Sequence, residues 1–425
     1  MGQEPAPAGN KDAGLRSSDR SMAERDEANR RAGAAAFLGQ GSARGQIPSF
    51  IVMDVMRAAQ AQEMAGRSII HMEVGQPGTP APKSARLAAM RALETSTLGY
   101  TMALGCEELR RRIAQLYREW YGIDVGPERV VVTTGSSAAF VLAFLAVFDA
   151  QDAVALPSPG YPCYRHILRA LGQKPVLIET GPASDWMPTG EDVARAASQD
   201  AIKGLLIASP ANPTGTMIAP QRLAELAQVC RQHQVQLISD EIYHGLTYDR
   251  RAETALSHSD DAIVVNSFSK YFSMTGWRIG WMVVPERLVR AVERLAQNLY
   301  IAPPAIAQAA ALGAFDGMDE LEANRRVYAE NRALLLEELP QAGFAKFAPC
   351  DGAFYLYCDV SGMTNDATAF AKAMLEEAGV ATTPGIDFDA ERGHRYLRFC
   401  YAGTNADMAE AARRLKAWSL ARQQG

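Results

Sequence analysis

"RVVVTTGSSAAFVLAFLAVF", residues 129–148, joins a short run of valines to a longer apolar segment through a Thr-Thr-Gly-Ser-Ser turn. Consecutive β-branched residues between turn signals are typical of a buried strand. The apolar segment after the turn is long enough for a helix. This stretch therefore predicts a strand that ends in a tight turn and leads into a helix, which is the repeating unit of α/β proteins.

Two helices are predicted ahead of this stretch, at 83–94 and 106–121. After it the same alternation continues as far as residue 284, with a predicted helix at 220–234. Continuous β-branched runs between helices indicate strands that are covered on both faces, as in a parallel sheet. We therefore predict an α/β protein whose large domain is a mostly parallel seven-stranded sheet flanked by helices. Its strands are expected at 129–135, 153–158, 174–179, 204–210, 235–240, 262–267 and 280–284.

The two ends of the chain differ from this middle part. After about residue 320 a long charged helix is followed by two alternating segments, 353–360 and 394–402, which are typical of antiparallel strands. A helix at 50–66 and a strand at 68–74 are predicted near the start. We expect residues 46–75 and 321–425 to form a smaller α+β domain, and residues 76–320 to form the large domain. Residues 1–45 are expected to be a disordered leader because they contain few apolar residues.

Composition narrows the class of protein. The net charge is −5, with 43 basic and 48 acidic residues spread along the chain, so no nucleic-acid partner is expected. The six cysteines form no Cys-x-x-Cys pair, which argues against a metal site or a disulfide framework. The longest apolar run, 138–148, is too short to span a bilayer. We expect a cytoplasmic protein without a membrane partner.

Several polar residues fall where predicted strands end. Ser136 and Ser137 begin a helix, a position that suits an anion. Asp240 ends an apolar strand, where a carboxylate needs a cation. Lys270 and Arg278 stand almost alone as charges in "SFSKYFSMTGWRIGW", residues 267–281. Taken singly, the serines and the aspartate could be ordinary helix caps. Together they match pyridoxal phosphate, which has a phosphate, a cationic ring nitrogen and an aldehyde that condenses with an amine.

At this point the chain resembles a fold type I pyridoxal-phosphate enzyme of the class I/II aminotransferase family, related to aspartate and aromatic aminotransferases. The order and spacing of the matching stretches carry this resemblance, and they cover nearly the whole chain after residue 46. The stretches are "GYTMALGCEELRRRIA" (99–114), "TTGSSAA" (133–139), "PSPGYP" (157–162), "SPANPTG" (209–215), "SDEIY" (239–243), "SFSKYFSMTGWRIGW" (267–281), "GAFY" (352–355) and "YLRFCYAG" (396–403).

The resemblance implies a role for each matching residue around the cofactor ring. Lys270 resembles the lysine that binds the cofactor covalently and later moves a proton. Asp240 resembles the partner of the ring nitrogen, and Tyr243 and Asn212 resemble donors to the ring oxygen. Tyr161 is similar to the aromatic residue that stacks on the ring.

The resemblance also implies how the phosphate is held and how subunits meet. Tyr100 is similar to a tyrosine that reaches the phosphate of the neighbouring subunit, which implies a homodimer with shared active sites. The phosphate cradle is expected to comprise Ser136, Ser137, Ser267, Ser269 and Arg278.

Substrate binding is expected at a third group of residues. Arg398 resembles the arginine that binds the substrate α-carboxylate, with the backbone of Gly75 and the side chain of Asn212 assisting. Arg395, three residues earlier, is the alternative for this role. Tyr164 and His244 lie near the motifs but are expected to pack or to face solvent.

The expected activity is transfer of an amino group from an L-amino acid to a 2-oxo acid by a ping-pong mechanism. The alternative is a C–S β-lyase or another eliminating enzyme of the same fold, because the same cofactor serves both reactions. A cofactor-sensing regulator would carry a winged-helix domain ahead of this region, and the 45-residue leader is too short for one.

Two departures from the family pattern bear on the substrate. Some aspartate-using members have a lysine where this chain has Ser137, and others have an arginine near the place of Gln297. Without a second cation for a side-chain carboxylate, a strict preference for aspartate is not expected. Alanine and apolar or aromatic amino acids are candidates beside glutamate.

Overall fold

This computed structural model describes residues 1–2 and 41–424. The chain divides into two units, Met1–Pro48 and Ser49–Gly425. Within the first unit the described residues include a single 3₁₀ turn, Ala43–Gly45. The leader predicted over 1–45 lies mostly outside the described residues. The second unit contains the three sheets of the described residues and all the site residues named above.

The larger sheet confirms the predicted arrangement of strands. In the described part of the chain it has seven strands in the order β2-β8-β7-β6-β5-β3-β4. Neighbours are parallel except at β8, which runs antiparallel to both β2 and β7. The strands are β2 (Val130–Thr133), β3 (Ala153–Ser158), β4 (Lys174–Glu179), β5 (Gly204–Ala208), β6 (Gln236–Asp240), β7 (Ile263–Ser267) and β8 (Gly280–Val283).

Successive side chains of these strands enter two separate hydrophobic cores. Val130 and Val132 of β2 belong to one core, and Val131 between them belongs to the other. The same alternation places Leu205 and Leu206 of β5 on opposite faces. Because side chains alternate along a strand, a sheet covered on both faces needs apolar residues at consecutive positions. This requirement explains the continuous valine, leucine and isoleucine runs.

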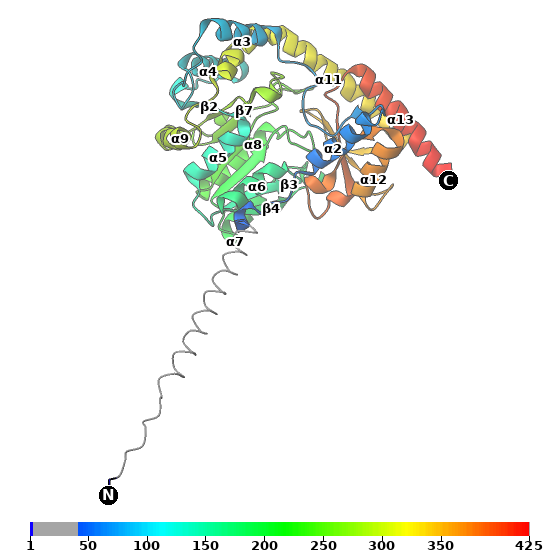
Figure 1. Ribbon diagram of the computed structural model, residues 1–425, viewed down its shortest axis with the longest axis horizontal. Coiled ribbons are helices and arrows are strands. Elements are labelled where there is room, and N and C mark those ends of the chain that lie inside the picture. The colour runs from blue at the N-terminus through cyan, green and yellow to red at the C-terminus, as the bar shows by residue number, and fades with distance from the viewer. Residues whose placement is uncertain (3–40, 425) are drawn as a thin grey trace. The chain divides into compact units, whose positions relative to one another are not determined.

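Helices cover both faces of the sheet, as the green and cyan ribbons of Figure 1 show. Helix α5 follows β2 directly and is apolar all round, as a helix buried between a sheet and other helices must be. The structure adds four helices that we did not predict from the sequence: α6, α7, α9 and α10. The helices of this region are α3 (Lys83–Thr95), α4 (Glu107–Tyr121), α5 (Gly135–Val147), α6 (Pro162–Leu171), α7 (Gly190–Gln199), α8 (Pro220–Gln232), α9 (Glu286–Leu299) and α10 (Ala305–Ala314).

A smaller antiparallel sheet, in the order β12-β13-β10-β9, lies in the C-terminal part of the chain. Strand β1 (Ile70–His71) is shorter than predicted and pairs in parallel with β11 (Val380–Ala381), so residues near the start join this C-terminal part. Helix α2 also lies there (Figure 1). The remaining elements are α2 (Ile51–Met64), α11 (Met318–Glu338), β9 (Lys346–Phe347), β10 (Tyr355–Asp359), α12 (Ala367–Ala373), β12 (Thr383–Pro384), β13 (Tyr396–Cys400) and α13 (Asn405–Gln424). The domain boundaries at residues 76 and 320 stay a prediction.

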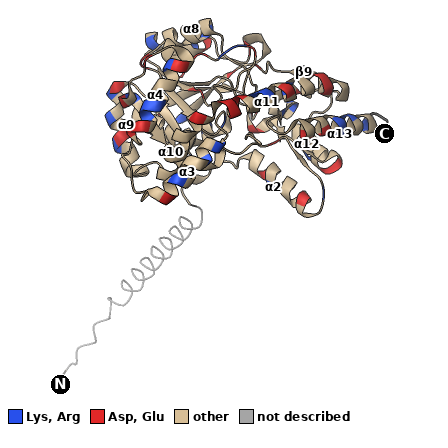
Figure 2. Ribbon diagram, turned by 90° about the horizontal axis from the view of Figure 1, so that it is seen from above, with Lys and Arg blue, Asp and Glu red and all other residues tan. Residues whose placement is uncertain are grey.

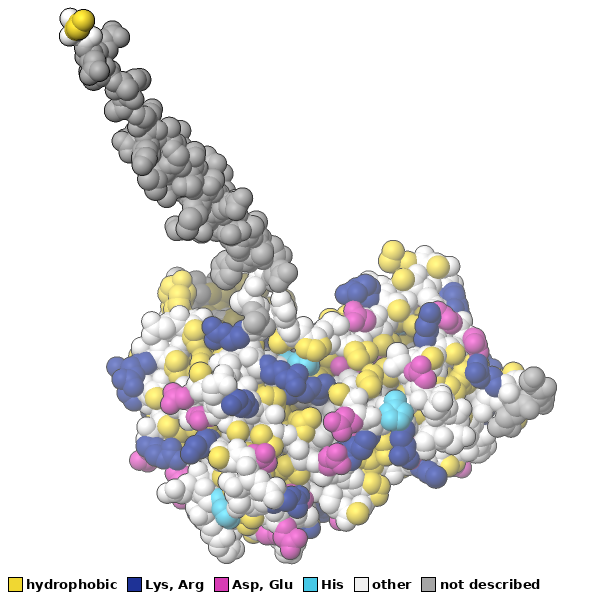
Figure 3. All heavy atoms as spheres, turned by 90° about the horizontal axis from the view of Figure 1, so that it is seen from below, with side chains coloured by type: hydrophobic (Ala, Val, Ile, Leu, Met, Phe, Trp, Pro, Cys, Tyr) yellow, Lys and Arg dark blue, Asp and Glu magenta, His cyan; other side chains and the backbone are white. Residues whose placement is uncertain are grey.

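Charged residues of both signs are interspersed on the surface. Figure 2 shows basic and acidic residues alternating along helices such as α9 and α11. On the face drawn in Figure 3, hydrophobic side chains lie singly or in small groups between the charges. Among the described helices, none combines the length and apolar character needed to cross a membrane.

Candidate active site

The candidate site residues meet at one edge of the large sheet. The carboxyl ends of β5, β6 and β7 lead into Asn212, Asp240 and Lys270, and β8 begins at the same edge just after Arg278. Parallel strands bring their carboxyl ends together, and ligands of open α/β sheets bind at this edge. The topology thus gathers residues that are far apart in the sequence.

Lys270 lies at the centre of this group. Its Nζ donates a hydrogen bond to the backbone oxygen of Gly75 at 2.5 Å. The same nitrogen lies 5.8 Å from the ring centroid of Tyr243 and 5.9 Å from that of Phe354. Burial lowers the pKa of Lys270 to about 8, and the positive charge of Arg398 acts in the same direction. The side chain is therefore able to act as a neutral amine near physiological pH.

Asp240 is a buried carboxylate at the end of β6. Its Oδ1 accepts a hydrogen bond from the backbone N–H of Ile242 at 3.0 Å, and its Oδ2 accepts one from the hydroxyl of Tyr164. Burial raises the pKa of Asp240 to about 6, while these hydrogen bonds and the charge of Lys270 oppose that shift. A carboxylate held ionised in such surroundings suits a cationic group of a ligand.

Tyr164 does more than we expected. It packs in a hydrophobic core, in line with the expectation, but its hydroxyl also donates to the Asp240 carboxylate. The two residues are 76 positions apart in the sequence, so no local pattern links them. His244, the other residue of that expectation, is buried within the protein.

Arg398 is buried on β13, with 1% of its surface exposed. Its Nη1 donates to Oδ1 of Asn212 at 2.9 Å, and its Nη2 donates to the backbone oxygen of Glu73 and to Thr383. Among the described residues, its Nε has no hydrogen-bond partner. A buried guanidinium held in this way presents a fixed fork that matches a carboxylate.

Arg395, the alternative to Arg398, lies elsewhere. Its side chain is 48% exposed, and its nearest carboxylate is Asp359 at 3.7 Å. Arg398, by contrast, lies between two rings, with its guanidinium carbon 4.5 Å from the centroid of Tyr355 and 4.7 Å from that of Phe388. Of these two arginines, only Arg398 joins the cluster around Lys270.

Tyr355 closes the site beside Gly75, and we did not identify it individually from the sequence. Its hydroxyl lies 2.7 Å from that of Tyr243. A Cβ added to Gly75 would lie 1.9 Å from the Tyr355 hydroxyl oxygen, so any larger residue would displace the ring. The signal that could have indicated Tyr355 is its place in the "GAFY" motif. Thr383 and Phe388, by contrast, belong to no motif that we recognised.

Arg278 lies against the start of α5. Helix α5 begins at Gly135, which has φ +73°, and a Cβ added there would lie 2.4 Å from Nη2 of Arg278. Free N–H groups in the first turn of a helix and an arginine fork both favour a phosphate. Ser136 in this turn is half-buried, whereas Ser137 is exposed.

Two serines lie at the end of β7. Their hydroxyl oxygens, Ser267 Oγ and Ser269 Oγ, are 2.8 Å apart, and the Ser267 hydroxyl donates to the backbone oxygen of Ile279 at 3.0 Å. A hydroxyl rotates to suit its partner, so these serines, with Arg278 and the α5 first turn, make a donor set that fits the phosphate of pyridoxal phosphate once the hydroxyls turn toward it.

Tyr161 and Tyr100 occupy different places. The Tyr161 ring packs edge-on against Tyr164 at 5.3 Å and against Phe50 at 5.9 Å, so it lies near Asp240. Tyr100 is 86% exposed, and its ring contacts no ring of the described members of the cluster. A single chain therefore leaves Tyr100 apart from the site.

Comparisons with known proteins show the family. The family model described as aminotransferase class I and II matches residues 67–415. The valine–pyruvate aminotransferase of Mycobacterium tuberculosis is 48% identical over 379 residues, 88% of this chain and 97% of that protein. The (5-formylfuran-3-yl)methyl phosphate transaminase of Methanocaldococcus jannaschii is 35% identical over 373 residues, 87% of this chain and 96% of that protein.

A solved structure of an aminotransferase has the same fold. The crystal structure of an aminotransferase from Mycobacterium tuberculosis superposes with a TM-score of 0.88 at 47% identity, covering 90% of this chain and 99% of that one. The chain therefore belongs to the class I and II aminotransferase family and is an aminotransferase.

Proposed function

We propose that this aminotransferase uses pyridoxal phosphate on Lys270 to transfer the amino group of an uncharged L-amino acid to a 2-oxo acid such as pyruvate. The observation that carries the proposal is the placement of Lys270, an amine with a lowered pKa, in one cluster with Asp240 and Arg398. Lys270 and Asp240 complement the aldehyde and the cationic ring nitrogen of the cofactor. Arg398 complements the carboxylate of an amino acid.

The cofactor supplies an electron sink for the electron pair that is left when the substrate Cα loses its proton. Lys270 would be the base that takes this proton and later returns it. Asp240 would hold the positive charge of the ring nitrogen, and Asn212 and Tyr243 would donate hydrogen bonds to the ring oxygen. Tyr161 would pack against the ring face.

Separate residues hold the two ends of the reacting system. Arg278 and the first turn of α5 bind the phosphate, with Ser267 and Ser269 adding hydroxyl donors. Arg398 binds the substrate α-carboxylate through its fork, while Gly75 leaves room for the substrate beside Tyr355. Fixing both ends orients the Cα–H bond and lowers the entropic cost of proton transfer.

The proposed substrate class depends on whether the site has a cation left over for a charged substrate side chain. The cations of the described cluster are Lys270, Arg278 and Arg398. Lys270 and Arg278 serve the cofactor and Arg398 serves the α-carboxylate that all amino acids share, so none of the three is left for a charged substrate side chain. The wall beside Tyr161 includes the apolar ring of Phe50. The likeness to a protein named valine–pyruvate aminotransferase supports an uncharged aliphatic donor and pyruvate as acceptor.

We further propose that the enzyme is a homodimer in which Tyr100 serves the partner's site. An exposed apolar surface supports this proposal, because large apolar side chains gathered outside the core favour association. Gln308 connects two segments of this surface. Its Nε2 donates to Thr101 Oγ1 and to the backbone oxygen of Pro303, each at 3.0 Å. The exposed apolar residues near these segments are Leu87, Met90, Leu93, Tyr100, Met102, Leu299 and Ile301.

Spectroscopy of the holoenzyme tests the reaction and Lys270 together. We expect valine or alanine to convert the visible absorbance of the bound cofactor to that of pyridoxamine phosphate, and pyruvate to restore it. Borohydride reduction before substrate is added should leave the pyridoxyl group on the peptide that contains Lys270, and Lys270→Ala should show neither effect. Absorbance that no amino acid changes would contradict transamination. Release of ammonia and pyruvate from a cysteine conjugate without an acceptor would favour the β-lyase alternative.

A further inference from the structure

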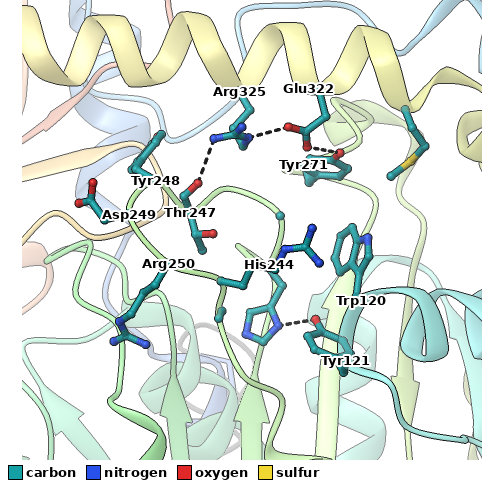
Figure 4. A pocket seen from close by; sticks show the side chains of 14 residues that line it. Trp120, Tyr121, His244, Thr247, Tyr248, Asp249, Arg250, Tyr271, Glu322 and Arg325 are labelled. Atoms are coloured by element: carbon teal, nitrogen blue, oxygen red, sulfur yellow. Dashed lines mark hydrogen bonds and ion pairs between the residues drawn. The ribbon is translucent and has the colours of Figure 1, made fainter.

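A cavity of about 560 Å³ lies behind the active-site loops, between α4, α11 and the segment after β6. This volume is within the range of sites that bind small organic molecules. Figure 4 shows its lining, with Arg325 and Glu322 on the α11 side, Trp120 and Tyr121 on the α4 side, and His244 at the bottom of the view. None of the roles proposed above uses these residues.

The wall of the cavity is aromatic. Trp120 and Tyr271 meet edge to face with ring centroids 5.4 Å apart. Both rings close over Gly245, which has φ +90°, and a Cβ added there would lie 2.6 Å from Tyr271 and 3.1 Å from Trp120. A glycine is thus required for the rings to approach this closely. Rings arranged in this way offer contact to a flat, aromatic ligand.

The charged side chains that line the cavity favour a ligand with a single negative charge. Three arginines, Arg250, Arg251 and Arg325, stand against two carboxylates, Asp249 and Glu322. Both carboxylates already have partners: Arg325 lies 2.8 Å from Glu322, and Arg332 lies 3.2 Å from Asp249.

Arg251 is the arginine left available. It is exposed, and within the described part of the chain no hydrogen bond or ion pair involves it. Arg250, by comparison, donates to the backbone oxygens of Met217 and Ile218. A ligand carboxylate could therefore bind the guanidinium of Arg251 without displacing another partner.

Two chain segments join the cavity to the active site. His244 lines the cavity and follows Tyr243, and Tyr271 lines it and follows Lys270. A ligand that lies against Trp120 and Tyr271 would contact the direct neighbour of Lys270, in a cavity that the direct neighbour of Tyr243 also lines.

His244 adds a third link. Its Nδ1 lies 2.6 Å from the hydroxyl of Tyr121, and its Nε2 lies 2.9 Å from the backbone oxygen of Ser209, three residues before Asn212. Burial lowers the pKa of His244 to about 3, so the ring is neutral. A neutral ring donates from one nitrogen and accepts at the other, so Nε2 donates to Ser209 and Nδ1 accepts from Tyr121.

We propose that this cavity is a second ligand site, which binds a small aromatic monocarboxylate and thereby changes the rate of transamination through the loops that carry Tyr243 and Lys270. The ring lies against Trp120 and Tyr271, and the carboxylate pairs with Arg251. The binding part is independent of the function proposed above, whereas the effect on rate rests on it.

Calorimetric titration of the holoenzyme with 4-hydroxybenzoate tests the binding, with the uncharged 4-hydroxybenzamide as the matched probe. We expect saturable binding of the acid and at least about tenfold weaker binding of the amide. Arg251→Glu should weaken binding of the acid by about tenfold or more, because it places a like charge opposite the carboxylate. Arg290→Glu, on the exposed side of α9, is the matched control and should leave binding unchanged.

Two parts of the proposal can be contradicted separately: the ligand site and its effect on the rate. No saturable heat, or equal affinity in wild type and Arg251→Glu, would overturn the site, the second result placing the probe elsewhere, such as at Arg398. An unchanged rate of cofactor conversion by valine at saturating 4-hydroxybenzoate would overturn the coupling. Failure of the proposed function is seen separately, because it would abolish cofactor conversion without any probe present.

Discussion

The hydroxyl of Tyr164 donates a hydrogen bond to Oδ2 of Asp240, while the backbone N–H of Ile242 donates to Oδ1 of the same carboxylate. Burial alone raises the pKa of this carboxyl group, and the two donors act against that shift. Tyr164 is therefore a positioning residue for the carboxylate that we assign to the cofactor nitrogen.

Tyr164→Phe is expected to reduce kcat by about tenfold, since a hydrogen bond to a charged group contributes about 1.5–3 kcal/mol. Losing a donor raises the pKa of Asp240 further above its usual range. The acidic form then persists to higher pH, so the acid limb of the kcat profile should move to higher pH. Steady-state kinetics with valine and pyruvate between pH 5 and 9 would measure both effects.

Tyr357→Phe is the matched control for this substitution. Tyr357 is also a buried tyrosine, but its hydroxyl has no hydrogen-bond partner among the described residues. We expect its kcat and pH profile to equal those of the wild type. If the two variants behaved alike, Tyr164 would be a packing residue.

Arg398→Lys should raise KM for the amino acid by about 100-fold, because a lysine cannot make the paired hydrogen bonds of the guanidinium fork and each bond to a charged group contributes about 1.5–3 kcal/mol. The positive charge is kept, so the fold of the buried site is preserved. Arg395→Lys, three residues away on the exposed side, should change KM less than about twofold. Equal effects of the two substitutions, measured as kcat/KM, would argue against the assignment of Arg398.

Capture of the cofactor should depend on the protonation of Lys270. Only the neutral amine attacks an aldehyde, and burial lowers the pKa of Lys270 to about 8. The rate of reconstitution of the apoprotein with pyridoxal phosphate should therefore rise with pH and level off above about pH 8. An ordinary lysine with a pKa of about 10.4 would give a rate that still rises at pH 9. Stopped-flow absorbance would distinguish the two profiles.

The large sheet could be predicted because its signals are local. Each strand from β2 to β8 carries its own apolar run, and burial on both faces explains why those runs are continuous in every strand but the edge strand β4, which is largely exposed. Lys270 and Asp240 could be named for a related reason, since parallel topology places strand ends at one edge. Helix α9 was missed although Leu288, Val292 and Leu295 have helical spacing, so its absence from the prediction has no physical cause.

The surroundings of the site could not be predicted, because they depend on contacts between distant segments. Arg398 contacts Glu73 across 325 positions, and Tyr164 contacts Asp240 across 76. No periodicity or local motif links such pairs. Tyr100 differs again, because its proposed role needs a second chain and its 86% exposure in one chain is compatible with that role.

Mixing two inactive variants tests whether Tyr100 serves the partner's site. Lys270→Ala lacks the proposed base, and Tyr100→Ala lacks the side chain that the partner would use. In a hybrid dimer, one site would have both residues and the other neither. Random reassociation makes about half of the dimers hybrids, so about a quarter of the wild-type activity should return. Tyr243→Ala replaces Tyr100→Ala as the control: if the proposed geometry holds, Tyr243 and Lys270 act in the same subunit, so each hybrid site lacks one of them and no activity should return. No recovery with Tyr100→Ala would show that Tyr100 does not act across the dimer, and recovery with the control would show that Tyr243 and Lys270 do not act in the same subunit.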